Sequence, residues 1–316
     1  MVGRMARKLR LEYEGAVYHI MNRGDRREPI FLDDKDRLLF LEALEQVCGK
    51  TGWQVHAYCL MPNHFHLVLE TPAANLVAGM KWFLGTYTGR FNRRHKLFGH
   101  LFSGRYKSLI VDGSGNGYLR TVCDYVHLNP VRAKLLGVRQ KLGHYPWSSY
   151  REYLRSPGRR PAWMRTDRLL GEMGIPKAST AGRRQFERMM EQRRGMDDPE
   201  TFKGLRRGWY LGDQAFRAEL VEQMGLQMGA EHYGEERRET DEQKAERIVT
   251  GELKRRGWKE SALGLRPKAD KVKIALAKRL RKETTMSLKW IAVRLQMGSW
   301  TYVSNLLAAS RGRKLR

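Results

Sequence analysis

Long uncharged apolar runs are missing from this chain of 316 residues. A membrane-spanning helix needs about 18 consecutive apolar residues, and no segment of the sequence approaches this, so a membrane protein is not expected. Cysteine is also scarce: the three residues Cys48, Cys59 and Cys123 lie far apart within apolar stretches. Such spacing favours reduced core thiols in a cytoplasmic protein over a disulfide framework or a zinc knuckle. The basic N-terminal stretch has no apolar run behind it, so we expect no signal peptide.

Acidic residues are few relative to basic ones. The sequence has 34 Asp and Glu against 60 Lys and Arg, a formal net charge of +26. A field of this sign attracts polyanions, chiefly nucleic acid. A solvated basic surface that only improves solubility is the plainer alternative. Because the excess recurs along the chain, we favour nucleic acid as the partner.

Strand and helix patterns alternate from about Tyr13 to Tyr153. Short apolar segments predict strands at residues 16–24, 53–60, 64–70 and 100–113. Apolar spacing of three and four predicts helices at residues 33–52, 73–96 and 117–137. This order indicates an α+β sandwich in which helices cover one face of a mainly antiparallel sheet. We therefore expect three regions: a first domain at 1–155, a linker with accessory helices at 156–240, and a basic all-α domain at 241–316.

The segment His64-Phe65-His66 lies on one predicted strand. Because strand side chains alternate, the two histidines share one face and Phe65 points to the other. Two neutral imidazoles at this spacing can reach one divalent metal ion. The alternative is a pair of partly exposed strand histidines without a ligand. His56, on the preceding strand, faces the core if the turn is tight, and we expect it to be structural.

Tyr125 and Asn129 lie one helical turn apart and share a helix face. A tyrosine beside a metal can attack a phosphodiester, because nearby cations favour the phenolate. The Asn129 amide oxygen is a hard ligand that could complete a site begun by two histidines. The alternative is a buried core tyrosine followed by a helix-ending Asn-Pro pair.

Four sequence blocks occur together: YHIMNRGDRREPIFLDDKDRLLFLEAL, MPNHFHLVL, GRYKSLIVD and DYVHLNPVRAKL. In this order they resemble the REP-associated tyrosine transposases of the single-tyrosine HUH superfamily, over residues 10–150. The resemblance implies a ferredoxin-like HUH domain. In that domain His64, His66 and Asn129 would bind Mg²⁺ or Mn²⁺, and Tyr125 would be the nucleophile.

The resemblance also implies a reaction on single-stranded DNA or on a hairpin with single-stranded flanks. Tyr125 would form a 5′-phosphotyrosine link and release a 3′-hydroxyl, which permits rejoining without ATP. Tyr106 and Tyr118 are rivals ranked lower, since one lies in a predicted strand and the other has no ligand four residues later. Phosphate contacts, or merely solvated charges, are expected at Arg23, Arg105, Lys107 and Arg132. Relatives include both monomers and homodimers.

The C-terminal extension is where this chain departs from the shorter members of the family. MSLKWIAVRLQMGSWTYVSNLLAAS has two helix-like runs around Met297-Gly298-Ser299. This pattern is typical of a helix-turn-helix whose second helix is opened and lined by Ser299, Trp300, Thr301 and Asn305. Any helical hairpin with a glycine turn has a similar pattern. The basic surroundings favour duplex or hairpin binding.

Together these features predict a cytoplasmic, metal-dependent single-strand DNA endonuclease and strand transferase acting at repeat-associated hairpins. A non-catalytic DNA-binding regulator with the same fold is the main alternative, and the intact histidine pair and tyrosine favour the enzyme. RNA binding is a third possibility. Against it, the strand GRYKSLIV lacks the aromatic consensus of the common RNA-recognition sheet.

Overall fold

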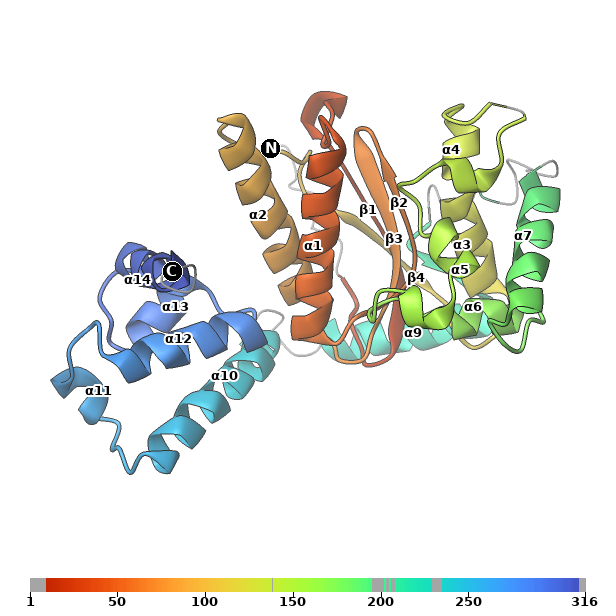
Figure 1. The fold of residues 1–316 in the computed structure, drawn as a ribbon. Coiled ribbons are helices and arrows are strands. Elements are labelled where there is room, and N and C mark those ends of the chain that lie inside the picture. The colour runs from red at the N-terminus through yellow and green to blue at the C-terminus, as the bar shows by residue number, and fades with distance from the viewer. Residues whose placement is uncertain are drawn as a thin grey trace, which may run out of the picture. The chain divides into compact units, whose positions relative to one another are not determined.

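The computed structural model describes residues 10–137, 139–194, 202, 205, 208–228 and 235–312. The chain divides into two compact units (Figure 1). The first comprises Met1–Cys48, Gly52–Leu76 and Phe83–Gly229, and the second Gly49–Thr51, Val77–Trp82 and Ala230–Arg316. Parts of all three predicted regions lie outside the described residues. None of the described helices is long and apolar enough to cross a membrane.

A five-stranded sheet in the order β2-β3-β1-β4-β5 forms the centre of the first unit. The strands are β1 (Ala16–Arg23), β2 (Gln54–Met61), β3 (His64–Thr71), β4 (Lys107–Val111) and β5 (Tyr210–Leu211). The first four pair antiparallel. Helix α1 (Asp34–Thr51) connects β1 to β2, and α2 (Leu76–His95) connects β3 to β4. This βαββαβ order is the ferredoxin-like arrangement, so the expected α+β class is confirmed.

Helices cover both faces of the sheet, so the expectation of one covered face is incomplete (Figure 1). On one face Phe40 of α1 packs against Phe65 of β3, with ring centroids 4.9 Å apart. Helix α3 (Tyr118–His127) packs on the other face, where Tyr125 contacts His66. Strand β2 shows why both faces are covered, because every residue after its first is buried. Strands buried on both faces read as nearly continuous apolar runs.

Residues beyond β4 complete the first unit. Short 3-10 turns lie there at Leu142–His144 and Pro157–Arg159, and another, at Asp25–Arg27, lies earlier in the chain between β1 and α1. The helices are α4 (Asn129–Arg132), α5 (Tyr150–Leu154), α6 (Asp167–Glu172), α7 (Thr180–Arg194) and α9 (Gln214–Met228). Strand β5 pairs parallel with β4, an addition that the sequence patterns did not predict.

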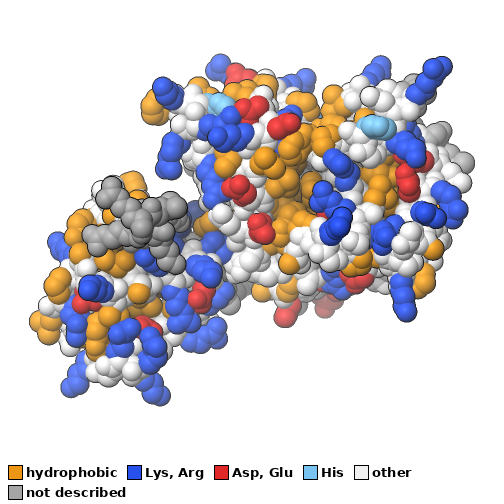
Figure 2. All heavy atoms as spheres, viewed as in Figure 1, with side chains coloured by type: hydrophobic (Ala, Val, Ile, Leu, Met, Phe, Trp, Pro, Cys, Tyr) orange, Lys and Arg blue, Asp and Glu red, His pale blue; other side chains and the backbone are white. Residues whose placement is uncertain are grey.

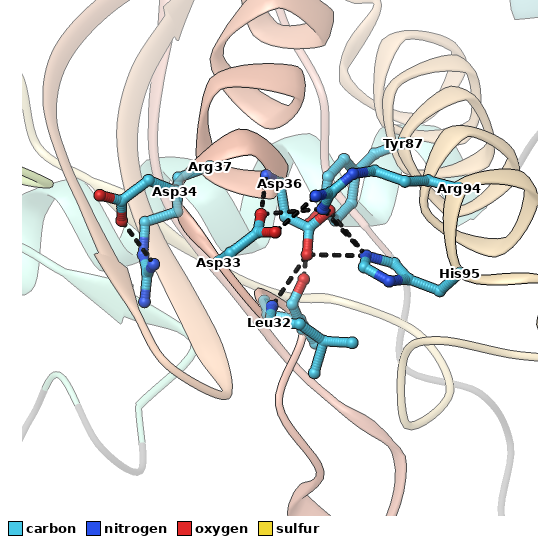
Figure 3. Close-up of polar contacts among 9 residues, drawn as sticks. Leu32, Asp33, Asp34, Asp36, Arg37, Tyr87, Arg94 and His95 are labelled. Atoms are coloured by element: carbon cyan, nitrogen blue, oxygen red, sulfur yellow. Dashed lines mark hydrogen bonds and ion pairs between the residues drawn. The ribbon is translucent and has the colours of Figure 1, made fainter.

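Charged side chains fix the first two helices to each other (Figure 3). Asp33 caps α1 by accepting a hydrogen bond from the backbone nitrogen of Asp36 at 3.1 Å. The fully buried Asp36 carboxylate pairs with Arg94 and lies 2.9 Å from His95 Nε2, both at the end of α2. Arg94 also pairs with Asp33. These contacts join the start of α1 to the end of α2.

Glu70, near the end of β3, forms a second charged cluster. Its Oε2 atom accepts from His56 Nε2 at 3.2 Å, from Arg165 at 3.1 Å and from Arg168 at 2.5 Å. Arg168 also donates to the Gly113 carbonyl. His56 is fully buried, and its other ring nitrogen lies 3.2 Å from the Arg165 carbonyl oxygen. These bonds give His56 the structural role expected for it.

Every described secondary-structure element of the second unit is a helix. Its helices are α10 (Glu235–Arg255), α11 (Ala262–Leu265), α12 (Lys271–Glu283), α13 (Leu288–Arg294) and α14 (Trp300–Gly312). Leu276, Leu280, Ile291, Leu295 and Val303 are among the residues of one buried apolar cluster. Asp270 caps α12 and Ser287 caps α13 through side-chain hydrogen bonds. This buried cluster holds α12, α13 and α14 together.

Candidate active site

The two histidines of the His64-Phe65-His66 segment lie on the face of β3 that α3 covers. Their ring centroids are 5.1 Å apart. Phe65 points to the opposite face and is fully buried there. His66 is only 2% exposed, whereas His64 is partly exposed. The two rings therefore share one face, and His66 is more deeply buried than a surface strand histidine.

Strand pairing brings a third histidine, His19 of β1, beside this pair. The register sets Met21 opposite His66 and Arg23 opposite His64, so alternation puts His19 on the same face. His19 Nε2 lies 2.9 Å from His66 Nδ1, and the two rings stack with centroids 5.2 Å apart. His19 was not among the site residues predicted from the sequence. Its spacing of two residues from Met21 and four from Arg23 was visible in the sequence, but the pairing of β1 with β3 was not.

Burial lowers the pKa of all three rings, which favours their neutral form. It lowers the pKa of His19 to about 4. It also lowers the pKa of His64 to about 4, with a smaller contribution from the charge of Arg23. Burial is again the largest cause for His66, whose pKa lies well below its usual value. Neutral imidazole is the form that binds a metal ion.

Tyr125 projects from α3 onto these rings. Its neighbours Asp124 and Val126 are buried, whereas Tyr125 is half-buried. The Tyr125 ring contacts both His19 and His66 edge-on, with centroids 5.7 Å apart in each case. The predicted nucleophile therefore lies directly against one of the two predicted histidine ligands.

Arg132 and Phe202 complete the described surroundings of Tyr125. The Arg132 guanidinium lies 4.6 Å from the centre of the Tyr125 ring and donates to the Tyr125 carbonyl at 2.7 Å. Phe202 lies 5.4 Å from Tyr125 and 4.2 Å from the Arg132 guanidinium. Arg132, expected at the edge of the site, thus packs as a cation over the ring of the candidate nucleophile.

Asn129 lies one turn after Tyr125, where Pro130 interrupts the helix. Proline removes one backbone donor, so α3 ends at His127 and α4 begins at Asn129. The backbone still bonds from Leu128 to the Asp124 carbonyl at 2.9 Å, which keeps the helical direction. Asn129 is buried, and its amide nitrogen has no partner among the described residues.

The two imidazoles of His64 and His66 and the amide of Asn129 remain the candidate metal ligands predicted from the sequence. Within the described part of the chain, no group of three or more His, Cys, Asp or Glu side chains forms a metal site. Oxygen ligands suit Mg²⁺ and Mn²⁺, and imidazole accommodates first-row metals. The donor types of His64, His66 and Asn129 fit such an ion.

The rival tyrosines have different surroundings. Tyr106 is buried beneath Arg10, whose guanidinium lies 3.6 Å from the ring centre. Burial raises the pKa of Tyr106 to about 12, although the charges of Arg10 and Arg105 oppose the shift. Tyr118 is the first residue of α3. Neither of the two has a ring contact with His64 or His66 within the described residues.

Exposed basic side chains flank the histidines. Arg23 ends β1 and Lys107 begins β4, and both are exposed. Lys107 lies opposite Met21 in the register, so it shares the face of His66. Arg105 is exposed two residues earlier. Figure 2 shows Lys and Arg over the visible face of each unit, with fewer Asp and Glu.

The loop before β4 adds an exposed aromatic side chain, Phe98, that the sequence analysis did not select. Phe98 is 98% exposed. Asn92 donates to the Gly99 carbonyl at 3.0 Å, and Asp25 donates to the Leu101 carbonyl at 3.0 Å. The second bond attaches the loop close to the end of β1. Residues 91–111 contain no Asp or Glu and five basic residues, Arg93, Arg94, Lys96, Arg105 and Lys107.

Of the four C-terminal candidate residues, Ser299 directly precedes α14 (Trp300–Gly312), and Trp300, Thr301 and Asn305 lie in its first half. The turn between α13 and α14 uses left-handed backbone at Gln296, with φ of 51°, and at Gly298, with φ of 86°. Ser299 Oγ accepts from the Tyr302 backbone nitrogen at 3.2 Å. Ser299, Trp300, Thr301 and Asn305 are all exposed. Their side chains are therefore accessible to a partner.

Comparison with known proteins bears on the first unit. Residues 12–129 match the family described as "Transposase IS200 like". A solved structure described as "Structure of the REP associates tyrosine transposase bound to a REP hairpin" is similar at 15% identity, with a TM-score of 0.41. That similarity covers 52% of this chain and 93% of the other. No curated protein matches the chain. The family match confirms the resemblance read from the sequence blocks.

Proposed function

Residues 12–129 match the family described as "Transposase IS200 like", and from this match we propose a DNA-processing enzyme of defined chemistry. It is a metal-dependent single-strand DNA endonuclease and strand transferase that acts at repeat-associated hairpins. The observation that carries this proposal is the position of Tyr125, whose ring lies 5.7 Å from that of His66. A nucleophile and a metal-binding group at this separation can act on the same phosphate.

The side chains divide the reaction between them. His64, His66 and Asn129 would hold Mg²⁺ or Mn²⁺, which when bound offsets negative charge on the scissile phosphate. The Tyr125 oxygen attacks phosphorus and loses its proton. The bond from phosphorus to the 3′-oxygen breaks, and that oxygen leaves with a proton as a 3′-hydroxyl. The 5′-phosphotyrosine link keeps the energy of the phosphodiester, so rejoining to another 3′-hydroxyl needs no ATP.

Basic side chains around the histidines support a single-stranded substrate. Arg23, Lys107 and Arg105 present positive charge beside the site, which suits a phosphate backbone passing over it. Phe98, nearly fully exposed in an acid-free segment, offers a ring on which an unpaired base can stack. A strand with unpaired bases can use both kinds of contact.

In the same proposal, α13 and α14 form a helix-turn-helix that binds the duplex part of a hairpin. Ser299, just before α14, and Trp300, Thr301 and Asn305 in its first half are exposed, and the first turns of a recognition helix read base edges. The protein would work as a monomer or homodimer in the cytoplasm. Residues 1–155 would carry the catalytic domain, with 156–240 as linker and accessory helices and 241–316 as the DNA-binding domain.

The test is covalent capture of DNA by the full chain. A single-stranded oligonucleotide with a repeat hairpin from the source genome is labelled at either end. Each labelled oligonucleotide is incubated with the protein and Mn²⁺ or Mg²⁺, and the mixture is run on a denaturing protein gel. We expect only the 3′-labelled fragment to migrate with the protein. Tyr125→Phe and EDTA should abolish the adduct, whereas Tyr118→Phe in the same helix should retain it.

The alternative is a non-catalytic DNA-binding regulator with the same fold. It predicts hairpin binding by the wild type without an adduct, across several repeats and both metals. That result would replace the enzyme with the regulator. Comparing single-stranded DNA with RNA of the same sequence separates both from an RNA-binding protein.

A further inference from the structure

Each of the two candidate metal-binding histidines has its Nδ1 atom occupied by a neighbouring side chain. His64 Nδ1 lies 2.7 Å from Asn63 Oδ1. His66 Nδ1 lies 2.9 Å from His19 Nε2. In both rings, therefore, Nε2 is the atom left for a metal ion, and a ring nitrogen binds a metal only when it carries no hydrogen.

The hydrogen position on His64 follows from the orientation of Asn63. Asn63 Nδ2 donates to the Arg27 carbonyl at 3.0 Å, which sets the amide so that Oδ1 faces His64. A carbonyl oxygen can only accept a hydrogen bond. His64 Nδ1 must then carry the hydrogen, and in the neutral ring Nε2 is bare.

His66 differs because its neighbour, His19, can either donate or accept. One hydrogen lies between the two neutral rings. If His19 Nε2 carried it, the hydrogen of His66 would be on Nε2 and would block metal binding. If His66 Nδ1 carries it, His66 Nε2 is bare. His19 is 5% exposed, and Tyr125 contacts both rings, so packing fixes their mutual orientation.

We propose that His19 and Asn63 are positioning residues that hold His66 and His64 with Nδ1 protonated and Nε2 bare for Mg²⁺ or Mn²⁺. Side chains that orient metal-binding histidines in this way commonly contribute about 10- to 100-fold to metal affinity. A carboxylate or a backbone carbonyl usually accepts this hydrogen bond. Here a buried neutral histidine accepts it for the deeper ligand. The inference rests on the proposed metal-dependent function.

The test measures Mn²⁺ binding to the full chain by calorimetry, in the absence of DNA. His19→Leu fills the buried position with an apolar side chain but removes the nitrogen that accepts from His66. We expect this variant to bind Mn²⁺ about 10-fold more weakly or worse. His19→Gln retains an amide carbonyl that can accept, so it should preserve most of the affinity. Met21→Leu, on the same face of β1, is the matched control and should bind as the wild type does.

Two results overturn the inference alone. The first is a folded His19→Leu protein that binds Mn²⁺ as tightly as the wild type, while His66→Ala abolishes binding. The second needs no variant: nitrogen NMR of the Mg²⁺-saturated wild type should find hydrogen on His19 Nδ1, and hydrogen on His19 Nε2 contradicts the proposal. Equal Mn²⁺ binding by the wild type and His66→Ala overturns the metal-dependent function as well.

Discussion

Glu70→Gln is expected to lower stability in a way that depends on pH. The Glu70 side chain is 14% exposed and accepts from His56, Arg165 and Arg168. Partial burial raises the pKa of this carboxyl, but the hydrogen bonds and the charge of Arg168 outweigh it and lower the pKa to about 2. Glutamine keeps the shape and one acceptor oxygen but removes the charge that the arginines neutralise.

The magnitude follows from the change in pKa. A fall from 4.5 to about 2 corresponds to roughly 3 kcal/mol, at about 1.4 kcal/mol for each pKa unit. Arg168 and Arg165 are 23% and 33% exposed, so solvent screens part of this interaction. We therefore expect Glu70→Gln to reduce the free energy of unfolding by about 2 kcal/mol at pH 7.

The pKa of Glu70 is lower in the folded chain than in the unfolded chain, so its contribution to stability is lost at low pH. The stabilisation is fully present above pH 4.5 and disappears as the pH falls towards 2. Urea unfolding of the wild type and the variant, followed by tryptophan fluorescence between pH 3 and 7, measures the difference. Asp34→Asn removes an exposed partner of Arg37 and is the control, with an expected loss under about 1 kcal/mol. A gap between wild type and Glu70→Gln that is unchanged from pH 7 to pH 3 would refute the reasoning.

Three other predictions concern DNA. Phe98→Ala should weaken binding of an unstructured single strand about fivefold or more, because stacking contributes about 1–3 kcal/mol per base. Leu135 is another exposed apolar residue, at 41%, and Leu135→Ala should leave this binding unchanged. Thr301→Ala with Asn305→Ala should weaken binding of a hairpin but leave covalent capture of an unstructured strand intact, and equal losses on both substrates would contradict a separate duplex-binding role. EDTA should abolish the adduct at Tyr125 while hairpin binding, measured by fluorescence anisotropy, persists.

Local periodicity was enough to predict part of the candidate site. Alternation along β3 put His64 and His66 on one face, and helical spacing put Asn129 one turn after Tyr125. Both relations are set by the backbone within a few residues. The structure places His66 and Tyr125 with 5.7 Å between ring centroids. Local spacing does not predict this proximity, which the family resemblance implied.

Features that depend on the pairing of strands far apart in the chain were not predicted from the sequence. His19 meets His66 only because β1 lies between β3 and β4, and 47 residues separate the two histidines. The burial of both sheet faces had a visible sign, the nearly continuous apolar run of β2 that only His56 interrupts, but a run of that kind also fits a buried helix. Phe98 could not be selected because neither spacing nor composition reports the exposure of a loop residue.

The parallel strand beside β4 has a practical consequence for dissecting this protein. Tyr210 and Leu211 complete the hydrogen bonding of β4: Ile110 donates to the Trp209 carbonyl at 3.0 Å and Asp112 to the Leu211 carbonyl at 2.8 Å. A fragment truncated after residue 155 would leave β4 as an open edge, a template for aggregation. It would also lose Arg165 and Arg168, the cationic partners of Glu70. The smallest soluble fragment with the histidines and Tyr125 should therefore extend past Leu211.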